Sequence, residues 1–422
     1  MLIDDLKSRL INSIDLTKKI SDDEIREMIS DMVMNEYAAA LMPVREKMRI
    51  CRELFNAIRG MDILQELLDD DDITEIMVNG AQDIFVEKEG KLYRHNGRFS
   101  SKEKLEDIIQ SVAAQTNKRI NESSPIMDAR LKDGSRINVV LGPIAIDGPV
   151  ITIRKFPKRA IDADKLIMLG SVTKEAASFL KRLVEAKYNI FISGGTGSGK
   201  TTMLNALSGF IPEEERIITI EDSAELQLIG TRNLVRLECR TRNAEGENAV
   251  NIRDLIRTSL RMRPDRIIVG EVRGAEALDM LQAMNTGPDG SISTGHANSV
   301  QDMFSRLEVM ALMAGEEIPV SAIRRQIASA IDIMIHLERM GDGSRKMVDI
   351  SQIEGISSDR IITSSLFEYR LCPDGSERKL IRTGTRLARI KGNMDDKLEE
   401  TVTGDQRRDI LSGSIIDTLS VL

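Results

Sequence analysis

Tryptophan is absent from this chain, and all aromatic residues together make up 3% of it. The hydrophobic cores must therefore be aliphatic. Sequence-tolerant binding of single-stranded nucleic acid uses aromatic side chains beside basic ones, and the chain has no lysine- and arginine-rich run with interleaved aromatics. The three cysteines, Cys51, Cys239 and Cys372, lie far apart and without CxxC spacing. This spacing favours reduced thiols over a disulfide framework or a zinc site.

Long apolar runs are missing as well. No stretch approaches the roughly 20 residues that a membrane-spanning helix needs. The first ten residues alternate charged and aliphatic side chains, unlike a signal peptide. We therefore expect a cytoplasmic protein that contacts a membrane only through partners. The net charge of −8 is a poor match to a dedicated nucleic-acid binder.

The first part of the chain is predicted to contain a helical segment and a small mixed domain. Residues 1–62 carry aliphatic side chains at helical spacing, with Ser21 as a candidate N-cap. Such a segment is either an internally packed bundle or a docking module for a partner. Residues 63–157 hold short β-type stretches around one amphipathic helix at 101–116, which predicts an α+β domain.

The second part of the chain changes character after a linker at 158–173. Over residues 174–370, continuous apolar strands alternate with helices. This alternation predicts an α/β domain whose parallel sheet is covered on both faces. Residues 371–422 are polar and charged, and we expect them to form a C-terminal tail.

The clearest chemical motif follows the predicted strand at 189–193. It fits the pattern G-x-x-x-x-G-K-[ST], in which glycines let the backbone wrap a phosphate at the positive end of the next helix. Lys200 is expected to neutralise the β- and γ-phosphates of ATP, and the Thr201 hydroxyl to ligate Mg²⁺. The predicted nucleotide-binding residues are Gly194, Gly195, Thr196, Gly197, Ser198, Gly199, Lys200, Thr201 and Thr202.

Two further predicted strands end in carboxylates. One leads to Glu271, where P-loop enzymes place an acid beside Mg²⁺ and the attacking water. Gly270 stands at the position where the usual aspartate is expected. The other strand leads to Glu221, at the sheet edge where α/β proteins bind ligands. We expect Glu271 to be the catalytic base and to reach Mg²⁺ through water, with Glu221 as a second acid for either task.

These motifs, in this order, resemble the secretion ATPase superfamily shared by type II secretion, type IV secretion and pilus-assembly motors. The matching pieces are the P-loop, the acidic box Thr219–Glu225, the strand and acid at Ile267–Gly274, and the histidine-box region Thr286–Ser299. Further stretches look like the subfamily that drives tight-adherence (Flp-type) pili. They include Arg119–Pro125, Asp128–Leu131, Asp133–Asn138, Asp147–Pro149 and Thr152–Phe156.

The resemblance implies a RecA-like ATPase domain, a hexameric ring and an inner-membrane platform protein as partner. It also implies that arginines of the N-terminal domain reach the γ-phosphate, where a guanidinium stabilises developing charge. Arg136 and Arg154 are the first candidates, with Arg130 behind them and Arg240 as a second-rank choice. The alternative for each arginine is an ordinary surface salt bridge.

One position departs from the family pattern. The histidine box usually carries two histidines, and here Pro288 stands at the first, so that His296 alone remains as a catalytic candidate. Proline cannot exchange a proton. Either the first histidine is dispensable, or this protein hydrolyses ATP differently or slowly. His95 and His336 are interpreted as structural. A nucleic-acid translocase and a weakly hydrolysing nucleotide-binding scaffold remain the alternatives to a motor.

Overall fold

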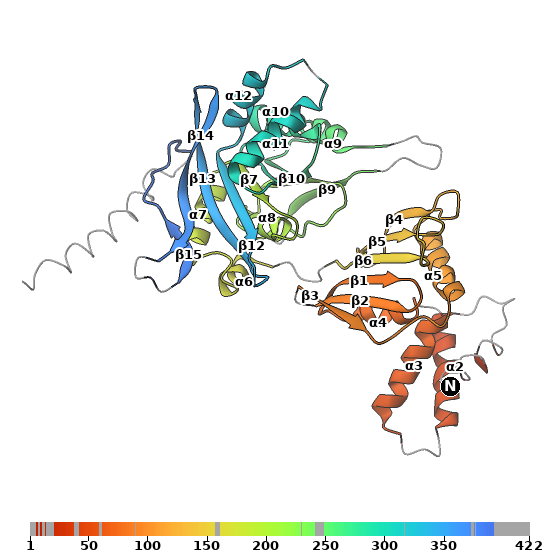
Figure 1. Ribbon diagram of the computed structural model, residues 1–422. Helices are drawn as coiled ribbons and strands as arrows, with labels where there is room; N and C mark the ends of the chain where they lie inside the picture. The colour runs from red at the N-terminus through yellow and green to blue at the C-terminus, as the bar shows by residue number, and fades with distance from the viewer. Residues whose placement is uncertain are drawn as a thin grey trace, which may run out of the picture. The chain divides into compact units, whose positions relative to one another are not determined.

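The chain divides into two units, Met1–Lys158 and Arg159–Leu422 (Figure 1). The computed structural model describes residues 21–37, 42–58, 61–88, 90–156, 161–228, 230–240, 249–315, 317–372 and 377–391, together with Leu6, Arg9, Leu10, Ser13 and Gly375. Among the helices so described, none is long and apolar enough to cross a membrane.

The first unit begins with three helices, α2 (Asp22–Glu36), α3 (Val44–Ile58) and α4 (Ile63–Asp69). Ser21 caps α2 as predicted, because its Oγ accepts from the N–H of Glu24 while the Glu24 carboxylate accepts from the N–H of Ser21. Leu6 and Leu10 are buried in one cluster with residues of α2 and α3. The remaining predicted core positions of the first helix, Ile11 and Ile14, lie outside the described residues.

The helices are followed by a six-stranded sheet with the order β3-β2-β1-β6-β5-β4, in which every pairing is antiparallel. Its elements are β1 (Ile73–Asn79), β2 (Asp83–Lys88), β3 (Lys91–His95), α5 (Lys102–Gln115), β4 (Ile126–Arg130), β5 (Arg136–Val140) and β6 (Val150–Arg154). Alternate strand residues such as Ile137 and Ile153 are buried against α5. The sequence predicted α5 and β-type stretches at 75–78, 84–86, 137–141 and 150–153, which correspond to β1, β2, β5 and β6. It missed β3 and β4, which are short and carry many polar residues.

The second unit contains a nine-stranded sheet with the order β15-β14-β13-β12-β7-β11-β10-β8-β9. Its strands are β7 (Ile190–Gly194), β8 (Arg216–Glu221), β9 (Asn233–Glu238), β10 (Arg266–Val272), β11 (Ile292–His296), β12 (Ile333–Arg339), β13 (Arg345–Ser357), β14 (Arg360–Leu371) and β15 (Arg378–Arg382). The strands from β12 to β9 in this order are parallel, and β13, β14 and β15 continue the sheet in antiparallel pairing. The predicted α/β class is confirmed.

Helices cover both faces of this sheet (Figure 1). They are α6 (Ala163–Met168), α7 (Lys174–Glu185), α8 (Lys200–Ser208), α9 (Ile252–Ser259), α10 (Glu276–Thr286), α11 (Val300–Leu312) and α12 (Val320–Ala330). Successive residues of β7 point to opposite faces, as a doubly covered strand requires. Ile190 and Ile192 join a core built with α6, α7 and α8, whereas Phe191 joins the core of α9 to α12.

The structure differs from the predicted boundaries at both ends of this unit. Leu166 of α6 belongs to the core with α7 and α8, so that part of the expected linker at 158–173 packs with the ATPase-type domain. At the other end, β15 pairs with β14 beyond residue 370, where the sequence analysis ended the domain. The start of the expected polar tail therefore belongs to the sheet, and residues 392–422 lie outside the described part of the chain.

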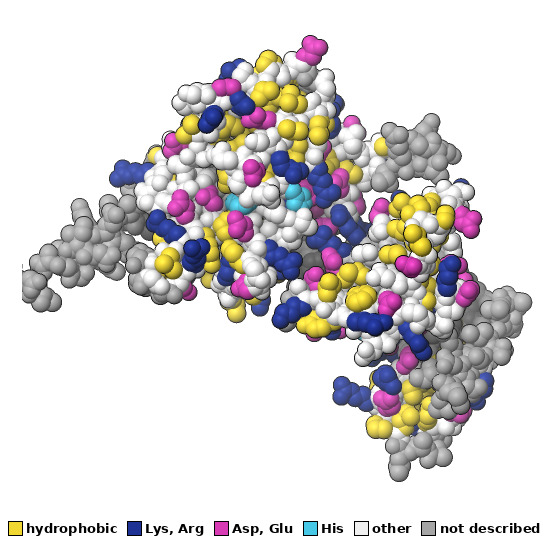
Figure 2. Space-filling view, viewed as in Figure 1, with side chains coloured by type: hydrophobic (Ala, Val, Ile, Leu, Met, Phe, Trp, Pro, Cys, Tyr) yellow, Lys and Arg dark blue, Asp and Glu magenta, His cyan; other side chains and the backbone are white. Residues whose placement is uncertain are grey.

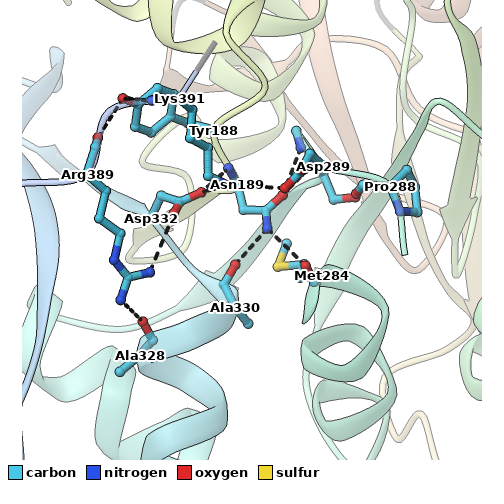
Figure 3. Close-up of polar contacts among 12 residues, drawn as sticks. Tyr188, Asn189, Met284, Pro288, Asp289, Ala328, Ala330, Asp332, Arg389 and Lys391 are labelled. Atoms are coloured by element: carbon cyan, nitrogen blue, oxygen red, sulfur yellow. Dashed lines mark hydrogen bonds and ion pairs between the residues drawn. The ribbon is translucent and has the colours of Figure 1, made fainter. Parts of the chain in front are cut away.

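The last described segment packs at the amino ends of the parallel strands (Figure 3). Asp332, which directly precedes β12, is 4% exposed. Its carboxylate accepts from the N–H of Asn189 at 2.8 Å and lies 2.7 Å from the Nζ of Lys391. The hydroxyl of Tyr188 donates to the carbonyl of Arg389 at 2.7 Å. Arg389 and Lys391, which follow β15, thus attach this segment to the amino ends of the parallel strands, opposite the P-loop.

Candidate active site

The glycine-rich loop lies between β7 and α8, as the sequence predicted. Two of its glycines, Gly197 (φ 69°) and Gly199 (φ 97°), adopt the left-handed conformation that disfavours other residues. Gly199 is also the N-cap residue of α8. A Cβ on Gly194 would lie 2.5 Å from both the Leu337 carbonyl oxygen and the Ser198 Oγ. The loop conformation therefore requires glycine at these three positions.

Lys200 is the most constrained side chain of the loop. It is 7% exposed, and its Nζ donates to the carbonyl oxygens of Gly194 at 3.0 Å and Gly195 at 2.9 Å. The Nζ also lies 3.1 Å from the Nδ1 of His296, at the end of the neighbouring strand β11. An ammonium group has three donors, and these contacts involve all of them. A phosphate that Lys200 binds must replace at least one of these partners.

His296 connects Lys200 to Glu271. Its Nε2 lies 2.7 Å from the Oε1 of Glu271, and its pKa is lowered, chiefly by burial and partly by Lys200, although Glu271 opposes the shift. The imidazole is therefore neutral near pH 7. Because Nδ1 faces the lysine donor, it acts as the acceptor, and the proton of the neutral ring resides on Nε2. The 2.7 Å contact of Nε2 with the carboxylate lacks hydrogen-bond geometry. His296 thus contacts both the loop lysine, Lys200, and the predicted base, Glu271.

Glu271 lies near the end of β10 and has a second cationic neighbour. Its Oε2 accepts from Arg273, at 2.6 Å from Nη2 and 3.0 Å from Nε. The acid on the adjacent strand accounts for the presence of glycine at residue 270, because a Cβ at this position would lie 3.0 Å from the Cγ of Glu221. A larger residue at 270 would therefore require the Glu221 side chain to shift by a few tenths of an ångström. The two carboxylates occupy adjacent strand ends.

Glu221 occupies a different environment from Glu271. It is 4% exposed at the end of β8, and burial raises its pKa to about 7, although backbone N–H donors and Arg236 partly offset the shift. Its Oε2 accepts from the N–H groups of Leu226 at 2.8 Å and Glu225 at 2.7 Å. Near neutral pH this carboxyl is about half protonated, and it is hydrogen-bonded to the loop that follows it. Glu221 is therefore better suited to shaping the loop at 222–226 than to accepting a proton from water.

A cavity of about 460 Å³ opens beside the loop. It is lined by Gly195, Thr196, Arg273, His296, Ala297, Asn298, Asp302 and Arg306. Arg273, Asp302 and Arg306 were not among the residues predicted for the site, although Arg273 lies in the stretch Ile267–Gly274 that resembles the family. The surface of the unit is not uniformly basic, because Figure 2 shows basic side chains interspersed with acidic ones on the face in view.

The remaining predicted residues lie elsewhere. Arg130, Arg136 and Arg154 form a row across β4, β5 and β6 in the first unit, because each is paired directly with the next. Glu75 of β1 continues the row beyond Arg154. Arg240 lines another cavity of the second unit, together with Asp222, Asn251, Arg273 and Glu276 among others.

The two histidines interpreted as structural have local partners. His95 accepts from the N–H of Gly97 at 3.0 Å. His336 is 4% exposed, and its Nδ1 lies 2.8 Å from the Oγ of Ser193. Both arrangements agree with the structural interpretation.

Pro288 lies at the opposite edge of the sheet from the P-loop. In the parallel pairing of β11 with β7, Ile292 is opposite Ile190 and His296 is opposite Gly194. Pro288 precedes Ile292, and its carbonyl accepts from the Oγ of Ser291 at 3.1 Å. Within this unit, proline at residue 288 therefore removes no proton-exchanging group from the loop. Of the two alternatives stated for Pro288, its position in this unit favours the one in which the first histidine is dispensable.

The loop and its acids are chemically suited to a nucleotide with Mg²⁺. Ser198 is 2% exposed, and its Oγ has no hydrogen-bond partner among the described residues. An unsatisfied buried hydroxyl is costly, and it lies in the loop where a phosphate oxygen is expected. Thr201 on α8 and Glu271 on β10 offer the oxygen ligands that Mg²⁺ prefers. Thr202 follows on the same helix.

Comparison with known proteins agrees with this geometry. A putative conjugal transfer protein of Mycobacterium tuberculosis is 34% identical over 313 residues, which cover 72% of this chain and 88% of that protein. Conjugal transfer protein TrbB of Rhizobium radiobacter is 33% identical over 324 residues, covering 76% of this chain and 95% of its own. The structure of the Yersinia pseudotuberculosis ATPase DotB has a TM-score of 0.51 at 18% identity, with 71% of this chain and 79% of that chain covered, which supports the fold alone.

The sequence profile of the family described as type II/IV secretion system protein matches residues 58–387, which is most of the chain. This range includes the six-stranded sheet, the P-loop and both strand-end acids. The chain therefore belongs to the family of type II/IV secretion system proteins, within the secretion ATPase superfamily.

Proposed function

We propose that this protein is an ATP-hydrolysing motor that works as a hexamer in pilus assembly or secretion, at the inner face of the cell membrane and through a platform protein. The observation that carries the proposal is the contact series from Lys200 through His296 to Glu271. It connects the residue expected to bind phosphate with the residue expected to activate water. A nucleotide-binding scaffold without turnover would not need that connection.

The proposed mechanism assigns a task to each side chain. Bound Mg²⁺ would supply charge neutralisation at the phosphates, with Thr201 as its ligand and Glu271 reaching it through water. Lys200 exchanges its loop carbonyls for phosphate oxygens. Glu271 accepts the proton of the attacking water, while Arg273 and His296 orient its two carboxylate oxygens. Glu221 shapes the neighbouring loop.

The arginine row supports a role for the first unit in the same reaction. Arg136 and Arg154 lie directly opposite each other on β5 and β6, and two neighbouring guanidinium groups suit an anion with several charged oxygens. We propose that this anion is the γ-phosphate, as the family resemblance implies. Assignment to the tight-adherence pilus subfamily rests on the motifs between Arg119 and Phe156. The two similar proteins described above are named as conjugal transfer proteins, which favours a conjugation system instead. Identifying the membrane protein that binds this chain would decide which system it serves.

Phosphate release from ATP tests the proposal directly. We expect Lys200→Ala to abolish turnover, while Lys181→Ala, at an exposed position of α7, should leave it unchanged. Near-wild-type turnover by purified Lys200→Ala protein would refute the site. The translocase alternative is tested in the same assay with DNA at two salt concentrations. Stimulation by DNA that fades as salt rises would favour translocation.

A further inference from the structure

The turn between β12 and β13 lies beside the P-loop. β12 is the parallel neighbour of β7, and in that pairing Leu337 is opposite Gly194, the first residue of the loop. β12 then continues past the end of β7 to Arg339, which is paired with Arg345 across the turn. The hairpin therefore extends beyond the sheet edge and carries two arginines to the level of the loop.

Arg345 contacts the loop directly. Its Nε donates to the carbonyl oxygen of Gly197 at 2.9 Å. A Cβ built on Gly199 would lie 3.5 Å from the Cδ of Arg345, so that the aliphatic part of the side chain covers the next glycine as well. The side chain contacts Gly197 and Gly199, the two loop glycines in the left-handed conformation.

The hydrogen bond fixes the orientation of one peptide group. In a trans peptide the C=O and the following N–H point to opposite sides. With the Gly197 carbonyl directed to Arg345, the N–H of Ser198 points the other way and donates to the carbonyl oxygen of Gly195 at 3.3 Å. Inward N–H groups are the donors that glycine-rich loops offer to phosphates. Arg345 and the Gly195 carbonyl thus hold the peptide group between Gly197 and Ser198 from its two sides.

Glycine-rich backbone is expensive to order, because glycine loses more conformational freedom than any other residue. Lys200 also bonds to loop carbonyls, but it must release some of them when it binds phosphate. Arg345 lies outside the loop and can keep its bond to Gly197 throughout. We propose that Arg345 is a positioning residue that pre-orders the P-loop for phosphate binding, an inference that rests on the nucleotide-binding role proposed above.

The hairpin has an anchor that does not depend on Arg345. The N–H of Met347 donates to the carbonyl of Ser171 at 2.9 Å, and the Nζ of Lys346 donates to the carbonyl of Gly170 at 2.7 Å. The N–H of Met340 also donates to the carbonyl of Ser344 across the turn, at 2.8 Å. Replacing the exposed Arg345 side chain should therefore leave the hairpin in place, which makes a change in nucleotide binding interpretable.

The test uses the full chain and equilibrium binding of a fluorescent ADP analogue with Mg²⁺. A hydrogen bond of this kind contributes about 0.5–1.5 kcal/mol, so Arg345→Ala should raise the Kd about three- to tenfold. The kcat at saturating ATP should change less than twofold. Arg345→Gln should restore binding, because its Nε2 is as many bonds from Cα as the Nε of arginine and can donate to Gly197. Arg360→Ala, at an exposed position that begins β14, is the matched control.

Three results would overturn the assignment. Wild-type affinity in Arg345→Ala would show that the loop needs no such support. Restoration by Arg345→Lys but not by Arg345→Gln would show that charge, and not loop positioning, matters. Unchanged hydrogen exchange at the amides of residues 194–200 in Arg345→Ala, without nucleotide, would contradict the pre-ordering. If the wild-type chain fails to bind the analogue, the proposed function fails, and the exchange experiment then decides on Arg345 independently.

Discussion

The two acids at the strand ends differ in what surrounds them, and the difference assigns their roles. Glu271 has Arg273 and His296 as polar neighbours. Glu221 is buried and bonded to the backbone of Glu225 and Leu226. A base that accepts a proton from water must be ionised and reachable. Glu221 meets these conditions poorly, because it is 4% exposed and burial raises its pKa to about 7.

We predict that Glu271→Gln retains ATP and does not hydrolyse it. The amide keeps the shape of the side chain but cannot accept a proton, so turnover should fall by ~10²-fold or more while nucleotide still binds. Phosphate release and retention of labelled nucleotide are measured on the same preparation. Glu221→Gln is the comparison. If Glu221→Gln is the more severe variant and Glu271→Gln is mild, the acid on β8 is the base.

The buried Glu221 carboxyl also predicts a pH dependence of stability. Its pKa is raised from 4.5 to about 7, chiefly by burial. Between these values the unfolded chain releases the proton while the folded chain keeps it. The free energy of unfolding should therefore fall as pH rises from about 4.5 to 7 and stay level above, by a total on the order of 3 kcal/mol.

Urea denaturation of the wild type and Glu221→Gln at pH 5, 6, 7 and 8 measures this effect. The variant should lose the fall in stability between pH 5 and pH 7, since glutamine does not titrate. Glu214→Gln, at an exposed position before β8, should keep the wild-type slope. Equal slopes in all three proteins would mean that Glu221 titrates alike in the folded and unfolded chain.

The sequence predicted the position of the P-loop between β7 and α8 correctly. The P-loop could be predicted because its glycines, lysine and threonine are consecutive and follow a buried strand. The contacts of Lys200 with His296 and of Arg345 with Gly197 join residues 96 and 148 positions apart. Their proximity depends on strand order and register, which neither motif encodes. The raised pKa of Glu221 likewise depends on burial that a strand-end acid does not reveal.

At the scale of elements, β11 shows how sequence proximity misleads. Pro288 and His296 both belong to the histidine-box region, but the strand Ile292–His296 separates them, so they lie toward opposite edges of the sheet. The antiparallel extension β13–β15 was also missed. Its strands mix polar and apolar residues, as expected for strands with partly exposed faces. The expected end at residue 370 cuts into this extension.

The segment after β15 should stabilise the second unit. Lys391 lies 2.7 Å from the buried Asp332 carboxylate, and Arg389 lies 3.7 Å from it (Figure 3). Removing one partner of a buried charge leaves the other uncompensated. Because Arg389 remains and Lys391 is partly exposed, we expect Lys391→Ala to lower the free energy of unfolding by about 1–3 kcal/mol.

Chemical denaturation of Lys391→Ala, Asp332→Asn and the double variant measures this ion pair as a coupling free energy. The double variant should be less destabilised than the sum of the two single variants. Lys379→Ala on β15, whose side chain is 51% exposed, serves as the control and should be near neutral. Strictly additive effects would mean that Lys391 does not stabilise the unit through Asp332.

For the whole molecule, the sequence predicted the order of the domains but not their limits. The predicted strands with strong apolar patterns occur in both sheets. The match of the family profile to residues 58–387 also spans both units. The boundary at 158–159 lies close to the expected linker. The arginine row could not be predicted as a row, because Arg130, Arg136 and Arg154 become neighbours only through strand pairing.

ATP hydrolysis by the second unit is expected to depend on the first unit. If Arg136 and Arg154 act on the γ-phosphate, Arg154→Ala should lower kcat by ~10-fold or more, because a transition-state charge loses its guanidinium. In a ring, turnover should be cooperative and should depend on protein concentration. A fragment spanning Arg159–Leu422 keeps Lys200 and Glu271 but should hydrolyse ATP poorly.

The rates are measured against protein concentration, with mass determined by light scattering. Arg94→Ala is a matched control, because Arg94 is an exposed arginine of the same sheet, on β3, paired with Asp83. It should hydrolyse ATP at the wild-type rate, and Arg154→Ala should unfold at the wild-type temperature. A monomeric full chain with concentration-independent turnover, equalled by the fragment, would contradict both the ring and the arginine roles. A slow Arg154→Ala variant that still assembles would assign Arg154 to the reaction and not to assembly.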